Sequence, residues 1–190
     1  MRKTVITLFF GITFFSCNTE ATIQDKDLYS INSKTLINQI LSTEFRDCDC
    51  IVEPRNESFI EKMKNEKPHY AYKNLLLEKL NISNESTLDS LLNRSHKFQI
   101  NNILKNRKIK IISQNELESI MHNNDKSNSY KILDEMCPKG ISVISKPLFN
   151  KNFQIALIDI QDFYGGCIPY EPYVCELKNG KWEFKFFYSD

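Results

Sequence analysis

Cysteine has the widest chemical range of the residue types in this chain, and its spacing raises the first question about function. The sequence contains six cysteines, and those after Cys17 lie at positions 48, 50, 137, 167 and 175. In an oxidising compartment such thiols form disulfides. Two disulfides would leave one of these five thiols unpaired. Any of the five could be the unpaired one, and the other four can pair in three ways, so fifteen arrangements stay open. We expect Cys167 to pair with Cys175, because a glycine loop leads from the first into the strand that holds the second.

The close pair Cys48 and Cys50, in the string DCDC, could instead share a metal ion. A structural zinc site needs four ligands, which usually come in closely spaced pairs. The chain has no C-x-x-C pair, and His69, His96 and His122 stand far apart in the sequence. We therefore expect neither a metal site nor a cofactor.

Motifs of the common enzyme classes are missing from the sequence. It contains no G-x-S-x-G, H-E-x-x-H, Walker or G-x-G-x-x-G pattern. A cysteine and a histidine that are distant in sequence can still meet in space as a nucleophile and its base. The sequence therefore assigns no catalytic residue, and an enzyme site assembled from dispersed residues stays as an alternative.

Three tyrosines near the C-terminus form the best candidate for a contact surface. The string YGGCIPYEPYVC places Tyr164, Tyr170 and Tyr173 beside two glycines and two prolines. Rigid aromatic side chains on a constrained loop suit binding, because little conformational entropy is lost when a partner docks. The same string also fits a proline-stiffened connection, held by a disulfide, with no role in binding.

Helices and one short strand are predicted in the first part of the chain. Ser86 with Asp89, and Ser113 with Glu116, form capping pairs ahead of apolar residues. Lysine and isoleucine alternate from Lys108 in KIKIIS, which indicates a short strand with one solvated face. Apolar residues recur at helical spacing in the segments 56–67, 69–80, 83–98 and 113–122.

The C-terminal part of the chain predicts an antiparallel β-meander. The runs ISVISKPLF, FQIALIDIQDF, YVCEL and KWEFKFFY are rich in β-branched and aromatic residues and are separated by turn residues. The second run is apolar on both faces, so we expect it to be an interior strand. The predicted fold class is α+β, with N-terminal helices packed on the C-terminal meander in a single domain.

The last turn, Asn179-Gly180, fixes a hairpin register. These two residues accept the positive φ angles of a type I′ turn. Tyr173, Leu177 and Trp182 then share one face, which we expect to be buried, and diagonal lysines offset the glutamate pair on the other face. The predicted pairs are Lys178–Lys181, Leu177–Trp182, Glu176–Glu183, Cys175–Phe184 and Tyr173–Phe186.

The N-terminus predicts where the protein resides. Arg2 and Lys3 precede an apolar run of about eleven residues, Val5–Phe15, which is shorter than the roughly twenty that cross a bilayer and typical of a secretory signal peptide. The run ends in FFSC, which resembles the lipobox of bacterial lipoproteins, with Phe14 where that motif most often has leucine. The resemblance implies that Cys17 is lipidated and becomes the first residue of the mature protein.

Lipidation would attach the protein to a membrane without a membrane span. One acyl chain holds only reversibly, whereas two or three chains give stable anchoring. We expect a signal peptide over 1–16, an extended flexible tether over 17–34 and the globular domain over 35–190. Because Asn18 follows Cys17 and the tether lacks a tight acidic cluster, the expected location is the outer membrane, facing the periplasm.

The charge of the chain argues against a nucleic-acid partner. Without Arg2 and Lys3, the 25 basic residues fall to 23, against 24 acidic residues. A nucleic-acid-binding protein usually carries a basic excess that attracts phosphates. The expected partners are therefore the membrane, through the lipid anchor, and an envelope protein, peptide or glycan.

A second resemblance covers residues 140–186, about a quarter of the chain. A Ser-x-Pro-x-Phe strand, a glycine loop and an Asn-Gly-x-Trp hairpin are similar to the C-terminus of uncharacterised bacterial envelope lipoproteins. This resemblance implies no activity, because turns and packing explain the matched residues equally well. They are Gly140, Ser145, Pro147, Phe149, Ala156, Gly165, Gly166, Gly180 and Trp182.

Together these patterns favour a non-catalytic envelope lipoprotein that acts as a binding or interaction module. The lack of a convergent polar cluster in the sequence motivates this interpretation. Besides the enzyme with a dispersed site, an immunity-type protein that neutralises an envelope toxin remains an alternative, on the grounds of size and location.

Overall fold

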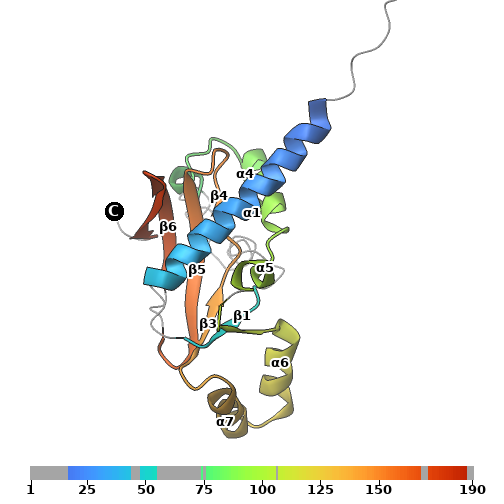
Figure 1. Ribbon diagram of the computed structural model, residues 1–190, viewed down its shortest axis with the longest axis vertical. Coiled ribbons are helices and arrows are strands. Elements are labelled where there is room, and N and C mark those ends of the chain that lie inside the picture. Colours follow the sequence, from blue (N-terminus) through green and yellow to red (C-terminus); the bar gives the residue numbers. More distant parts are fainter. Residues whose placement is uncertain are drawn as a thin grey trace, which may run out of the picture.

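The computed structural model describes residues 17–43, 48–54, 74, 76–105, 107–167 and 171–187 (Figure 1). Within these ranges, helices cover both faces of one mixed sheet. The helices are α1 (Cys17–Thr43), α4 (Glu85–Ser95), α5 (Ile100–Leu104), α6 (Gln114–Asn123) and α7 (Lys126–Met136). The strands are β1 (Cys50–Val52), β2 (Lys110–Ile112), β3 (Ile141–Ile144), β4 (Leu148–Phe149), β5 (Ile155–Tyr164), β6 (Glu171–Lys178) and β7 (Lys181–Phe186).

The sheet combines a parallel part and an antiparallel part. Its order is β2-β1-β3-β5-β6-β7, and β4 pairs with β5 off this path. β1 runs parallel to β2 and β3, whereas the other pairings are antiparallel. The α+β class, the C-terminal meander and the interior place of β5 are therefore confirmed. The strand expected from Lys108 is β2, but β1 was not predicted.

The β6–β7 hairpin has the predicted register at every pair. Asn179 and Gly180 have φ angles of 52° and 76°, the positive values that a type I′ turn requires. This turn makes the register a local property of the sequence. The observed pairs are Lys178–Lys181, Leu177–Trp182, Glu176–Glu183, Cys175–Phe184 and Tyr173–Phe186.

The solvated face of this hairpin carries the predicted charge pairs. Lys178 Nζ lies 2.6 Å from a Glu183 carboxylate oxygen and 3.1 Å from Glu176. Lys185 Nζ lies 3.0 Å from the other oxygen of Glu176. The two opposed glutamates are thus each neutralised by a lysine.

The aromatic face of the hairpin is buried at one end only. Trp182 is 2% exposed and Tyr173 is 4% exposed, whereas Phe186 is 46% exposed. The prediction of a fully buried face is therefore wrong at Phe186. Trp182, next to the turn, is bonded to α1 through the side chain of Gln39, whereas Phe186 lies at the other end of β7, on the edge strand of the sheet.

Helix α1 crosses one face of the sheet (Figure 1) and corrects the expectation of an extended tether over 17–34. Its residues Leu36, Ile37 and Ile40 are fully buried, and the buried Tyr29 hydroxyl donates to the Pro147 carbonyl at 2.9 Å. The threonines, serines and asparagines of this segment are weak helix formers, but packing of an apolar face supplies most helix stability in proteins. No helix in the described ranges combines the length and apolar composition that crossing a bilayer requires.

Side chains alternate between two faces along the strands. Ile51 packs in the cluster beneath α1 and α5, whereas its neighbours Cys50 and Val52 pack against α6 and α7. In the same way Ile158 lies on the α1 side and Leu157 packs with the leucines of α4. One face is therefore covered by α1 and α5, and the other by α4, α6 and α7.

Capping residues define the starts of the helices, with one shift from the prediction. Ser113 Oγ accepts a hydrogen bond from the Glu116 backbone N–H at 3.1 Å, as expected. Helix α4 is capped by Asn84, which accepts from the Thr87 N–H at 2.9 Å and also from Ser86 Oγ. The helix expected over 56–67 lies outside the described residues, and residues 74 and 76–79 of the next expected helix are helical.

Candidate functional site

The carboxyl ends of the three parallel strands meet at one edge of the sheet. The register places Val52 of β1 beside Ile112 of β2 and Val143 of β3. In sheets with parallel strands, ligands commonly bind outside these carboxyl ends, where the following loops converge. The residues that follow the strands are Glu53 and Pro54 after β1, Ser113 to Asn115 after β2, and Lys146 after β3.

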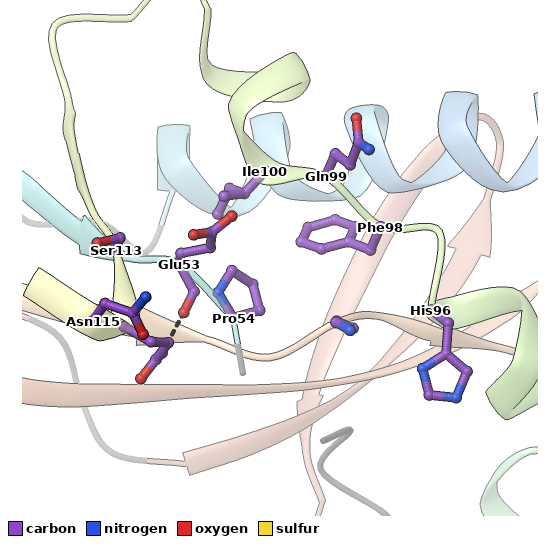
Figure 2. Close-up of a pocket in the computed structure, with 10 residues that line it drawn as sticks. Glu53, Pro54, His96, Phe98, Gln99, Ile100, Ser113 and Asn115 are labelled. Atoms are coloured by element: carbon purple, nitrogen blue, oxygen red, sulfur yellow. Dashed lines mark hydrogen bonds between the residues drawn. The ribbon is translucent and has the colours of Figure 1, made fainter. Parts of the chain in front are cut away.

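A pocket of about 410 Å³ lies at this edge, and we call it the carboxyl-edge pocket (Figure 2). Its volume falls within the range that is usual for small-molecule sites, roughly 300–1,000 Å³. Figure 2 shows His96 at one end, Ser113 and Asn115 at the other, and Glu53 and Phe98 between them. The lining residues are Glu53, Pro54, His96, Phe98, Gln99, Ile100, Ser113, Gln114, Asn115 and Lys146.

Hydrogen bonds fix the polar wall of the carboxyl-edge pocket. Gln114 Nε2 donates to the carbonyl oxygen of Glu53, which joins the start of α6 to the end of β1. On the opposite wall, Gln99 Oε1 accepts from Asn102 Nδ2 at 2.7 Å. These bonds orient two of the lining amides before any ligand binds.

Buried residues support the pocket from below. Phe98 and Ile100 belong to the core cluster beneath α1, and Lys146 is only 7% exposed. Lys146 also makes an interaction within the protein. The formal charges of Lys146 and Glu53 cancel, and the other polar side chains in the described part of the lining are mostly amides.

The pocket does not bring together a cysteine and a histidine. Of the residues that the structure describes, its lining contains one histidine, His96, and no cysteine. Figure 2 shows the imidazole of His96 well away from the Glu53 carboxylate. The exposed His122 lies elsewhere, on α6, with Nδ1 at 2.9 Å from the Glu118 carbonyl oxygen, and His69 lies outside the described residues. Among the described lining residues, the structure therefore shows no cysteine beside a histidine.

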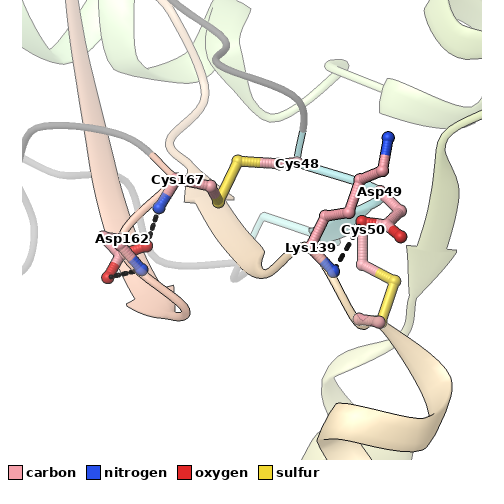
Figure 3. Close-up of a disulfide and its surroundings, with 8 residues drawn as sticks. Cys48, Asp49, Cys50, Lys139, Asp162 and Cys167 are labelled. Carbon is pink, nitrogen blue, oxygen red and sulfur yellow. Dashed lines mark hydrogen bonds between the residues drawn. A yellow bond between two sulfur atoms is a disulfide. The ribbon is translucent and has the colours of Figure 1, made fainter.

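Two disulfides lie at the opposite, amino edge of β1 (Figure 3). Cys48 bonds to Cys167 and Cys50 bonds to Cys137, with Cα–Cα distances of 5.4 and 5.8 Å. Both distances suit disulfide geometry. The expected bond between Cys167 and Cys175 was therefore wrong, and Cys175 is the thiol left over.

The antiparallel register explains why Cys167 cannot reach Cys175. Cys175 lies opposite Ala156, near the start of β5, whereas Cys167 follows the end of β5 at Tyr164. Eight residues of strand separate these positions, roughly 26 Å, and a disulfide needs Cα atoms within about 7 Å. The loop leads into the strand that holds Cys175, but it enters at the far end.

Close backbone packing brings Cys167 to Cys48. Asp162 accepts hydrogen bonds from the N–H groups of Gly166 and Cys167, at 3.1 and 3.0 Å, which turns the chain after β5 (Figure 3). Gly140 has a φ of 112°, and a Cβ atom there would lie 2.7 Å from the Tyr164 carbonyl oxygen and 2.9 Å from Cys167 Sγ. Glycine at position 140 is thus required by both its backbone angle and its neighbours.

Neither the unpaired cysteine nor the DCDC pair is placed for metal or thiol chemistry. Cys175 is fully buried, and this burial raises the pKa of its thiol far above the usual range. Cys48 and Cys50 point into different disulfides, so they do not share a metal ion. Among the described residues, no group of three His, Cys, Asp or Glu side chains could hold a metal ion.

Of the three tyrosines expected to form a contact surface near the C-terminus, Tyr173 does not lie at the surface. Tyr173 is 4% exposed and belongs to the core, because its position in the hairpin register faces α1. Tyr164 is half-buried, stacks on Tyr130 with ring centroids 5.4 Å apart, and donates to Asp134 at 2.7 Å; this hydrogen bond raises the pKa of Tyr164. Tyr170 lies outside the described residues.

The carboxyl-edge pocket was not predicted from the sequence. The available signal was the repeated placement of polar residues directly after short apolar strands, in CIVEP, KIISQN and ISVISK. That signal becomes informative only when the three strands are known to be parallel neighbours.

Comparisons of the chain with protein-family models, with curated proteins and with solved structures gave no match.

Proposed function

We propose that the protein is a lipoprotein of the bacterial cell envelope, anchored through Cys17, whose folded part binds a polar ligand without converting it. The basic head, the short apolar run and Ser16 before Cys17 support the export and lipidation part of this proposal. The two disulfides support it independently, because such bonds persist mainly in oxidising compartments.

Helix α1 suits attachment at its first residue. It begins at Cys17 and runs for 27 residues, a length of about 40 Å. Figure 1 shows its start beyond the body of the molecule, at the end opposite α6 and α7. An anchor at Cys17 would therefore hold the sheet and its pocket away from the lipid surface.

The carboxyl-edge pocket carries the binding part of the proposal. It is preformed by hydrogen bonds and by core side chains, and its wall is polar. A catalytic role would need a nucleophile beside a base. Figure 2 shows His96 separated from Glu53. Four cysteines are bonded in the two disulfides, and the thiol of Cys175 is buried. Binding is thus the role that this geometry supports best.

Fractionation of cells tests the anchor. Changing Cys17 to Ala should move the protein from the membrane fraction to the soluble periplasmic fraction with its thermal stability unchanged. The matched variant Asn18→Ala keeps the cysteine and should stay with membranes. A Cys17→Ala protein that still sediments with membranes would remove the lipoprotein proposal.

Native mass spectrometry tests binding. The Cys17→Ala protein is incubated with small molecules from an envelope extract and should retain a ligand of constant mass. The double variant Gln99→Ala, Asn115→Ala should lose that ligand, whereas Asn101→Ala, at an exposed amide outside the pocket, should keep it. Conversion of the bound molecule over time would favour the enzyme, and no ligand that depends on the pocket would overturn the binding role.

A further inference from the structure

The hydrogen-bonding groups of the carboxyl-edge pocket indicate what its ligand must offer. Gln99 Oε1 is occupied by Asn102, which leaves the Gln99 amide N–H groups as donors. Ser113 Oγ accepts from Glu116, which leaves its O–H as a donor. Gln114 uses Nε2 on Glu53, which leaves Gln114 Oε1 as an acceptor. The two walls of the pocket therefore offer both donors and acceptors.

An apolar ligand does not fit such a wall. Each buried polar group left without a partner costs about 1–3 kcal/mol, so a ligand must return the hydrogen bonds that water makes in the empty pocket. Asn115 adds an exposed amide at the end of the wall, with both a donor and an acceptor. The ligand must therefore be rich in hydrogen-bonding groups.

Charge favours a neutral ligand over an anion. Among the described lining residues there is one ammonium group, Lys146, and one carboxylate, Glu53, and their formal charges cancel. Lys146 also makes an interaction within the protein. Most of the polar lining is uncharged, in three amides and one hydroxyl: Gln99, Gln114, Asn115 and Ser113.

We propose that the carboxyl-edge pocket binds a neutral saccharide, an inference that rests on the proposed binding function. Each sugar hydroxyl both donates and accepts, which matches a lining that offers both donors and acceptors. The apolar lining residues Pro54, Phe98 and Ile100 are themselves buried, so hydrogen bonds to the polar side chains would carry the recognition. The pocket volume of about 410 Å³ leaves room for a small saccharide.

Titration followed by nuclear magnetic resonance tests the ligand class. Glucose, N-acetylglucosamine and maltose are added separately to the ¹⁵N-labelled Cys17→Ala protein through the millimolar range, where simple sugar sites bind. Inorganic phosphate and glycine serve as the anionic and zwitterionic probes. At least one sugar should shift the side-chain amide signals of Gln99, Gln114 and Asn115, while the signal of Asn101 stays in place.

Matched variants locate the binding. Asn115→Ala removes an exposed amide from the wall and should weaken sugar binding about tenfold, whereas Asn101→Ala should leave it unchanged. If phosphate or glycine shifts these amides and no sugar does, the saccharide class is overturned while a binding function stands. If no probe shifts them, the saccharide class is also overturned, and the extract experiment above then decides the binding function separately.

Discussion

Trp182 joins the edge strand to helix α1 through both of its backbone polar groups. Its N–H donates to Gln39 Oε1 at 2.9 Å, and its carbonyl oxygen accepts from Gln39 Nε2 at 2.5 Å. The indole ring packs against Phe149, with ring centroids 5.7 Å apart. Because an unpaired edge strand invites pairing with other chains, this side-chain amide also occupies the place where a foreign strand would add.

Replacing this tryptophan should remove much of the stability. Truncation of a buried tryptophan costs about 3–5 kcal/mol, within a total of roughly 5–15 kcal/mol for a domain. Trp182→Ala should therefore show a large drop in the free energy of unfolding, measured by denaturant titration. The wild-type emission should be blue-shifted, and solvent-like emission with an unchanged mutant stability would contradict the burial of Trp182.

The thiol of Cys175 should be chemically silent in the folded protein. It is fully buried and its pKa is raised by burial, so almost no reactive thiolate is present at neutral pH. In the Cys17→Ala protein, a thiol reagent should label no cysteine in native buffer and one after denaturation. Labelling of the native protein at the rate of a free thiol would contradict the observed pairing.

At the scale of elements, the β6–β7 hairpin depends on a turn that only certain residues tolerate. Gly180 has a φ of 76°, and a Cβ atom added there would meet nothing within 4 Å. Gly180→Val should therefore destabilise the protein through its backbone conformation alone, by about 1–3 kcal/mol. Thermal unfolding measures this loss. In the same assay, Asn179→Gly should keep a melting temperature close to that of wild type, because glycine also accepts a positive φ.

The charge pairs on this hairpin should make the free energy of unfolding depend slightly on pH in the acid range. Hydrogen bonds first from Lys185 and then from Lys178 hold the pKa of Glu176 below its usual value. A lowered folded-state pKa stabilises the fold above the unfolded value of about 4.3, and this contribution is lost as the pH falls through the folded pKa. Because such pairs are solvated, the loss should stay below about 1 kcal/mol.

A comparison of two proteins measures this effect. The difference in unfolding free energy between wild type and Glu176→Gln should be larger at neutral pH than at about pH 3. A difference that grows as the pH falls would reverse the assigned sign. High salt should also reduce the difference at neutral pH, because exposed charges are screened.

Elements built from local signals were predictable, and those built by distant pairing were not. The turn chemistry of Asn179-Gly180 is contained in a few neighbouring residues, so every pair of the hairpin was predicted. Strand β1 has only three residues and exists because β2 and β3 flank it in parallel. Helix α1 was missed for a similar reason, since the stripe of Leu36, Ile37 and Ile40 stabilises it only against the sheet.

At the scale of the whole molecule, both disulfides and the pocket depend on the same parallel strands. The amino edge of β1 carries Cys48 and Cys50, and its carboxyl edge carries Glu53. The bonded cysteines are separated by 119 and 87 residues in the chain, and the pocket residues are spread as widely. No local pattern contains these neighbours, so neither the pairing nor the pocket could be read from the sequence.

Removing one disulfide should destabilise the whole fold. The bond between Cys48 and Cys167 closes a long loop, and loss of a native disulfide typically costs about 2–5 kcal/mol. The double variant Cys48→Ser, Cys167→Ser should therefore melt at a lower temperature than wild type. The melting temperature of Cys175→Ala should decrease much less. Peptide mapping without reduction should recover the Cys48–Cys167 fragment, and a Cys167–Cys175 fragment would refute the assignment.

The position of the disulfides also decides how the protein would respond to a pulling force between its start and a ligand. Helix α1 precedes Cys48, so it lies outside both covalent loops, whereas the residues that line the pocket lie inside the larger one. Under tension α1 can unwind from about 40 Å to about 95 Å. The disulfide holds the two ends of the segment between Cys48 and Cys167 together, but the core residues Phe98 and Ile100 beneath the pocket pack in the cluster that α1 covers. A pull that unwinds α1 would therefore also weaken the support of the pocket.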